Sequence, residues 1–289
     1  SGSDSAAIVR GAVVNVGSAG TPVANLSMTG GNSTVSGTTN HESDARIEGT
    51  TALNVRVAGD VGLAGGTAVI TGTAGSSQKA GASAILKGSS LLFSVAGNVT
   101  LTGGTANAAT GGNTATANAQ IVAGSAFNPV ILGDLDLVGG SATAQPIAGE
   151  IANAVAGARF ESEGDLLLKV SGNINLQGGN AVAINNTGGT FAEADASALV
   201  RSVAKVGIEV GQNFGITGGS AVATGSGLRA IGSAGVSTGD IAAGESLLIK
   251  TAGNMSLTGG SGSGAAADAA ALIYSAAEAK LNVGGPAGL

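Results

Sequence analysis

The chain has 289 residues and a composition unlike that of a compact enzyme: 52 are glycine, 10% are charged, 2% are aromatic, and tryptophan and cysteine are absent. The net charge of −6 comes from 18 acidic and 12 basic residues scattered singly, which disfavours a nucleic-acid-binding protein, because those carry a clustered basic surface. Low charge and a mean hydropathy of +0.37 exclude a disordered chain, and no apolar run is long enough to span a membrane as a helix.

A short phrase recurs seven times: Asn or Asp, apolar, any residue, apolar, any residue, then Gly-Gly. The first glycine of each pair falls at 30, 65, 103, 139, 178, 218 and 259, so the repeats are 35 to 41 residues long. A self-similar period of this length is typical of a stacked-repeat protein.

From the second copy onward, the alternation of apolar and polar residues predicts a strand with one buried face ahead of each phrase. The fourth copy is interpreted as one residue shorter than the others. The predicted inward residues are Leu53/Val55/Val57, Leu91/Phe93/Val95, Asn128/Val130/Leu132, Leu166/Leu168/Val170, Val206/Ile208/Val210 and Leu247/Ile249/Thr251. A corner such as Ala96-Gly97-Asn98 follows, where glycine and Asn or Asp are expected because they tolerate left-handed backbone.

The phrase itself predicts a second strand, whose apolar residues two positions before Gly-Gly should stack from repeat to repeat as a core ladder. This core ladder consists of Met28, Leu63, Leu101, Leu137, Leu176, Ile216 and Leu257.

Alternating alanines follow Gly-Gly, as in Ser141-Ala142-Thr143-Ala144, and small inward residues imply that two walls of the coil come close together here. The closing runs at 192–206 and 265–281 could be helical on alanine propensity alone. We favour strands, because the strict alternation from Phe191 to Ala198 places both acids on one side.

These features predict an all-β fold, a right-handed parallel β-solenoid of about seven repeats spanning residues 1–289 as a single domain. Both ends have the pattern of interior repeats, so we expect an excerpt of a longer array. The sequence leaves open whether each repeat makes one broad coil or two compact ones, which would give a stack of roughly 34 Å or roughly 67 Å.

The most regular polar feature is a column of Asn and Asp at the start of each phrase. It could supply oxygen ligands to Ca²⁺, but calcium needs six to eight oxygens and each copy offers one residue. We expect instead a structural Asn/Asp ladder that hydrogen-bonds the corner backbone from coil to coil. The ladder consists of Asn25, Asp60, Asn98, Asp134, Asn173, Asn213 and Asn254.

No catalytic, cofactor or metal site is predicted. His41, the single histidine, lies beside Glu42 and Asp44 but has no second histidine or cysteine to complete a zinc site, so we expect a solvated loop. The acidic pair Asp134/Asp136 and the acidic group at 161–165 are interpreted as a solvated outer face rather than a glycosidase pair. Tyr274 and the five phenylalanines are widely spaced in the sequence, which disfavours an aromatic sugar-binding cleft.

The residues Ala96-Gly97-Asn98-Val99-Thr100-Leu101-Thr102-Gly103-Gly104 and their copy at 252–260 resemble the repeats of filamentous-haemagglutinin-like exoproteins of bacterial two-partner secretion. This resemblance covers nearly the whole chain. It implies secretion through an outer-membrane partner, a long surface fibre, and a role in adhesion or biofilm.

We therefore expect a non-enzymatic shaft or fibre segment of an extracellular or cell-surface adhesin, without a cofactor, whose copies associate end to end or laterally. The alternative is a carbohydrate-binding or polysaccharide-cleaving β-helix. The sequence identifies no receptor.

Overall fold

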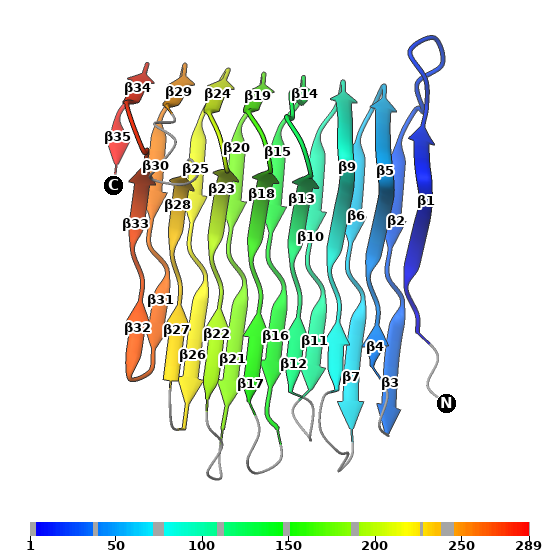
Figure 1. The fold of residues 1–289 in the computed structure, drawn as a ribbon, viewed down its shortest axis with the longest axis vertical. Helices are drawn as coiled ribbons and strands as arrows, with labels where there is room; N and C mark the ends of the chain where they lie inside the picture. Colours follow the sequence, from blue (N-terminus) through cyan, green and yellow to red (C-terminus); the bar gives the residue numbers. More distant parts are fainter. Residues whose placement is uncertain are drawn as a thin grey trace.

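The structure is a computed structural model, which describes residues 4–36, 40–71, 78–108, 113–146, 151–185, 191–225, 228–237 and 246–288. In these residues every regular element is a β-strand, all pairings are parallel, and no helix is present that could cross a bilayer. The chain winds as a parallel β-solenoid whose coils lie side by side from the N-terminus to the C-terminus (Figure 1). The predicted fold class is confirmed.

Each coil passes through four sheets in the order B, C, D and A. Sheet B contains β2 (Leu26–Thr29), β6 (Val61–Ala64), β10 (Val99–Thr102), β15 (Leu135–Val138), β20 (Ile174–Gln177), β25 (Phe214–Thr217), β30 (Met255–Thr258) and β35 (Ala287–Gly288). Sheet C contains β3 (Asn32–Ser36), β7 (Thr67–Thr71), β11 (Thr105–Ala108), β16 (Ser141–Ala144), β21 (Asn180–Ile184), β26 (Ser220–Thr224) and β31 (Ser261–Ser263).

Sheets D and A form the opposite wall. Sheet D contains β4 (His41–Glu42), β8 (Lys79–Gly81), β12 (Thr114–Thr116), β17 (Ala152–Val155), β22 (Ala192–Asp195), β27 (Leu228–Ile231) and β32 (Ala266–Asp268). Sheet A contains β1 (Ala7–Val16), β5 (Ala45–Val57), β9 (Ala84–Val95), β13 (Ala119–Ala123), β14 (Val130–Ile131), β18 (Ala158–Ser162), β19 (Leu166–Val170), β23 (Ala198–Ser202), β24 (Val206–Val210), β28 (Ala234–Ser237), β29 (Leu247–Thr251), β33 (Ala271–Tyr274) and β34 (Ala279–Val283). In Figure 1 sheet A runs upward nearest the viewer while the coils advance from right to left, so the solenoid is right-handed.

One repeat makes one broad coil. Leu63 pairs with Leu101, and Leu101 pairs with Leu137, in the register of sheet B. The whole core ladder from Met28 to Leu257 continues this register, so equivalent side chains lie in file along one axis. The longest dimension of the molecule lies along the strands, as Figure 1 shows, and the described coils together form a slab with two broad faces.

The interior is divided into two compartments of different thickness. Large side chains such as Leu101, Phe93 and Ile121 fill the space between sheets A and B. Between sheets C and D the buried cluster is almost entirely alanine, including Ala106, Ala154 and Ala194. Small inward residues do bring the two walls together here, as the alternating alanines predicted.

The two compartments meet at a waist formed by the Gly-Gly pairs. The backbone amide of Gly104 donates a hydrogen bond of 2.6 Å to the carbonyl oxygen of Ala82, which lies on the opposite wall between β8 and β9. A Cβ at Gly104 would overlap the carbonyl oxygen of Gly66 in the preceding coil. A Cβ at Gly103 would overlap the carbonyl oxygen of Ala117 on the opposite wall, so close backbone approach in two directions explains why both positions are glycine.

The closing runs are strands rather than helices. Ala192, Ala194, Ala196 and Ala198 are fully buried, and the side chains of the intervening Glu193 and Asp195 remain partly exposed, as the alternation predicted. The run at 265–281 likewise forms β32, β33 and part of β34.

Two expectations about local structure were wrong. In the fourth copy the inward residues are Phe127, Pro129 and Ile131, whereas Asn128, Val130 and Leu132 point outward. Ile131 pairs with Val170 without any deletion, because both stand three residues before their ladder residue; the assumed shortening shifted the register by one.

The corner glycines do not need left-handed backbone. Among the described glycines only Gly17 and Gly225 have positive φ, at 75° and 120°. Gly97 is required for a different reason, because a Cβ there would overlap the Asp60 carboxylate and the backbone of Gly59.

Candidate functional site

The Asn/Asp ladder runs along the corner between sheets A and B. The Oδ1 atom of Asn98 accepts a hydrogen bond from the backbone amide of Asp134 at 2.9 Å, and the Oδ1 atom of Asp134 accepts one from the amide of Asn173 at 2.6 Å. The same bond links each neighbouring pair from Asn25 to Asn254. Asn173 and Asn213 each donate a further side-chain bond of 3.0 Å to the ladder residue before them.

The Oδ1 atom of each ladder residue from Asn25 to Asn213 therefore already accepts a hydrogen bond from a backbone amide of the protein itself. Each carboxylate or amide lies next to one other ladder residue on either side, so no group of oxygens converges on a point as Ca²⁺ requires. In the described residues no three His, Cys, Asp or Glu side chains are grouped as metal ligands would be.

A second polar row, which the sequence analysis missed, lies where sheet D passes into sheet A. The Oδ1 atom of the buried Asp44 accepts a hydrogen bond of 2.6 Å from the amide of Ser83, whose Oγ accepts one of 3.1 Å from the amide of Asn118. Asn118 in turn accepts a bond of 2.8 Å from the amide of Gly157. The available signal was a polar residue directly before the alanine that opens sheet A in these repeats.

His41 is not in a solvated loop. It lies in β4 with 1% of its surface exposed, and its Nδ1 is 3.8 Å from the Oδ1 atom of Asp4. It is buried because it occupies the inward position of sheet D that Ala80 fills in the next coil. Asp4 and Ser5 lie along this coil, where the carboxylate of Asp4 accepts a bond from the amide of Glu42.

The acidic residues predicted on the outer face are not buried. Asp134 lies directly before β15 and Asp136 lies within it. Glu161 lies in β18, and Glu163 and Asp165 follow this strand. Two of the phenylalanines, although far apart in the sequence, meet inside the solenoid. Phe127 and Phe160 stack with ring centroids 5.5 Å apart, but both are fully buried and form no exposed platform.

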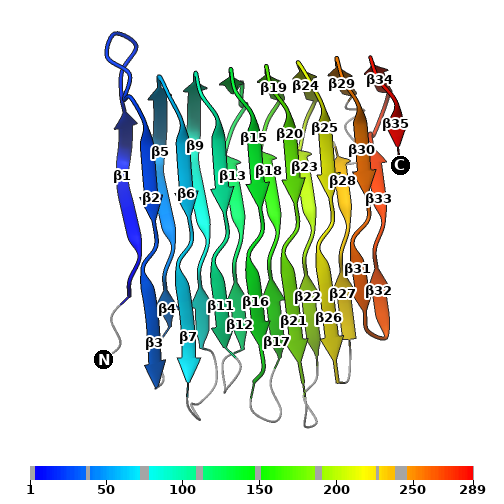
Figure 2. The same cartoon turned by 180° about the vertical axis from the view of Figure 1, so that it is seen from behind.

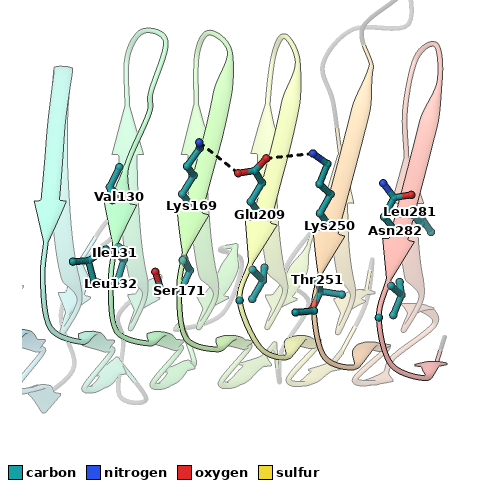
Figure 3. Close-up of a pocket in the computed structure, with 16 residues that line it drawn as sticks. Val130, Ile131, Leu132, Lys169, Ser171, Glu209, Lys250, Thr251, Leu281 and Asn282 are labelled. Carbon is teal, nitrogen blue, oxygen red and sulfur yellow. Dashed lines mark hydrogen bonds and ion pairs between the residues drawn. The ribbon is translucent and has the colours of Figure 1, made fainter.

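A groove of about 1100 Å³ runs along the solenoid axis over five coils. It follows the outer side of β14, β19, β24, β29 and β34, where Lys169, Glu209 and Lys250 stand side by side on neighbouring coils (Figure 3). Both Lys–Glu distances are 3.4 Å. Apolar residues line the groove near its ends, with Val130 and Leu132 at one end and Leu281, beside Asn282, at the other (Figure 3).

The row of Lys169, Glu209 and Lys250 lowers the pKa of its central carboxylate. The positive charge of Lys169, together with hydrogen bonds from Lys250 and Lys169, holds the pKa of Glu209 below its ordinary value. All three side chains are about half exposed, so solvent weakens the pairs and the row is a modest contributor to stability. The groove offers two ammonium groups and one carboxylate, but no nucleophile paired with a general base.

Comparison with known proteins gives no relative: no protein-family model, no curated protein and no solved structure matches this chain. The chain is a parallel β-solenoid repeat protein on the strength of its own structure.

Proposed function

We propose that this chain is a structural shaft segment of a secreted bacterial surface adhesin or extracellular filament that acts in adhesion or biofilm. The observation that carries the proposal is the unbroken register of equivalent residues along one axis, from Met28 to Leu257. Each coil adds the same backbone ladder to the previous one, so the architecture extends without limit by repetition.

The polar rows support a mechanical role. The Asn/Asp ladder and the Asp44–Ser83–Asn118 row place side-chain hydrogen bonds parallel to the axis, in addition to the backbone bonds of four sheets. Bonds in this direction resist separation of the coils, which is the load that a shaft bears.

The proposed location can be tested on the producing bacterium with an antibody raised against the purified chain. Immunogold electron microscopy of intact cells should label fibres or the outer surface, and brief protease treatment should remove the label. Label that appears only after the cells are broken open would contradict the proposal. Loss of surface label on deletion of a co-encoded outer-membrane transporter would support the secretion route that the family resemblance implies.

The shaft role has its own test, because a shaft depends on its length rather than on one coil. Deletion of residues 104–139 removes one complete period between equivalent glycines and should leave a folded chain. Cells carrying the shortened protein should still adhere and form biofilm. Complete loss of adhesion with the shortened protein folded and displayed would indicate a specific binding site in the deleted coil.

A second candidate function is polysaccharide binding along the groove, favoured by its extent over five coils and by the ammonium groups of Lys169 and Lys250. Titration of the chain with anionic and neutral polysaccharides, followed by calorimetry and by assay of new reducing ends, tests this reading. Saturable binding that the Lys169→Met, Lys250→Met double variant loses would support it.

A further inference from the structure

The two broad faces of the slab differ in charge. Figure 2 shows sheets B and C running end to end as one face, which we call the B–C face. Within the described strands of these two sheets, Asp136 is the one charged residue, and lysine and arginine are absent. The opposite wall, formed by sheets A and D, carries the ion pairs Arg10–Glu48, Arg159–Asp195 and Arg229–Glu193 and the row in the groove.

Most outward side chains of the B–C face are short. In the third coil they are Thr100, Thr102, Thr105 and Asn107, and the fifth coil presents Asn and Gln together with Val182 and Ile184. Short side chains lose little rotamer entropy when they are covered, and hydroxyl and amide groups can both donate and accept hydrogen bonds. The strands of successive coils keep nearly the same direction in Figure 2, so this face has little twist.

The B–C face is large enough for a stable interface. Seven coils at about 4.8 Å give about 34 Å along the axis, and the ten residues from Val99 to Ala108 span about 33 Å. The resulting area of about 1,100 Å² exceeds the roughly 800 Å² that each partner contributes to a standard protein interface.

We propose that the B–C face docks onto the B–C face of a second copy of this chain. Charge decides which face two copies can share: copies with a net charge of −6 repel each other least when they meet through the uncharged face and their charged walls point away from each other. A two-fold axis parallel to the solenoid axis lays sheet B of one copy over sheet C of the other and keeps the two Asp136 carboxylates apart. The inference deepens the proposed shaft role by naming the face through which shafts bundle laterally.

Complementary charges on the midline of this face provide the test. Thr102 and Gln177 lie next to the Gly-Gly waist, close to the proposed two-fold axis. The wild-type chain should be a dimer by sedimentation equilibrium. The Thr102→Lys, Gln177→Lys variant and the Thr102→Glu, Gln177→Glu variant should each dissociate at least 100-fold more readily, and an equimolar mixture of the two should form a heterodimer.

The matched control places two lysines on the opposite wall, where Ser94 and Val122 point outward from sheet A. The Ser94→Lys, Val122→Lys variant should dimerise like the wild type. Small-angle scattering should show a dimer that is thicker than the monomer and has the same length as the monomer along the solenoid axis.

Several results would overturn the inference: a wild-type monomer at all accessible concentrations, a dimer insensitive to charges at Thr102 and Gln177, or a dimer elongated along the axis. A monomer whose B–C face binds a neutral polysaccharide would also overturn it, in favour of that other occupant. These results leave surface location and tolerance of a deleted coil untouched, so failure of the inference is distinguishable from failure of the shaft proposal.

Discussion

The backbone amide of Gly104 and the carbonyl oxygen of Ala82 form a hydrogen bond across the interior of the solenoid, from the start of sheet C to the opposite wall. The same bond links Gly66 to Ser43, Gly140 to Ala117 and Gly179 to Ala156, each at 2.7 Å. Most solenoid hydrogen bonds join equivalent strands of neighbouring coils, but this series ties the two walls together, from the start of sheet C in one coil to the end of sheet D in the coil before it. The Gly-Gly pair is therefore the element that fixes the distance between the two walls at the waist.

Substitution of Gly104 by alanine should be strongly destabilising. The added Cβ would overlap the Gly66 carbonyl and the Gly65 backbone, and neither can move without breaking sheet register. We expect a loss of about 3 kcal/mol or more, measured as a lower midpoint of urea unfolding. Gly62→Ala is the matched control, because nothing lies within 4 Å of a Cβ at this outward position of β6. The Gly62→Ala variant should be as stable as the wild type or more stable by about 0.5 kcal/mol. Equal effects of the two substitutions would contradict the close backbone packing at the Gly-Gly pair.

The thin compartment should not accept a larger side chain. Ala154 of β17 is fully buried between sheets C and D, where the facing residues are also alanine. Ala154→Leu should cost about 3 kcal/mol, since overpacking must push the two walls apart. The neighbouring Val155 points outward on the same strand, and Val155→Leu should change the unfolding temperature by less than about two degrees. An Ala154→Leu variant as stable as the wild type would mean that the walls are not in close contact.

The repeat phrase was enough to predict most of the fold. The register of a parallel stack follows the alternation of apolar residues, and the seven copies share the same alternation. Residues that depart from the repeat were misjudged. Phe127 and Ile131 were assigned to the outside because Val130 and Leu132, which flank Ile131, are also apolar. The apolar alternation in this copy therefore fits a register shifted by one residue as well as the correct one.

His41 was misplaced for a related reason. The equivalent residues of the next coils, from Ala80 to Ala230, are buried alanines, but a histidine among polar neighbours has no alternation to reveal this. The waist could not be derived either, because a glycine pair indicates close approach without identifying what approaches. The row from Asp44 to Asn118 mixes Asp, Ser and Asn, so it forms no uniform column in the sequence.

The pKa of Glu209 should follow the charge of its neighbours. Lys169 and Lys250 lower it, so the row contributes stability at pH values above the ordinary carboxyl value of 4.5, and this contribution is lost as the pH falls through the lowered pKa. In an NMR titration of the side-chain carboxyls, Lys169→Met should raise the pKa of Glu209 towards its ordinary value, and added salt should do the same. Lys87→Met, which removes a cation that does not contact Glu209, should leave it unchanged. A pKa insensitive to both Lys169→Met and salt would show that the row is not formed in solution.

The order of Asn and Asp along the ladder should matter because neighbouring ladder residues share a hydrogen bond. Asn173→Asp places a carboxylate directly beside Asp134 and removes the donor that now gives Asp134 a bond of 3.0 Å. We expect a loss of about 1 to 2 kcal/mol at pH 7, and the loss should shrink below pH 4 or so, where aspartate carboxylates become protonated. Asn213→Asp removes an equivalent donor bond of 3.0 Å, but both of its ladder neighbours are neutral asparagines. Its effect should therefore be smaller and nearly independent of pH. If urea unfolding at pH 7 and pH 3.5 finds the two variants alike, the side chains are too solvated to interact, and the ladder would act only through its bonds to the backbone.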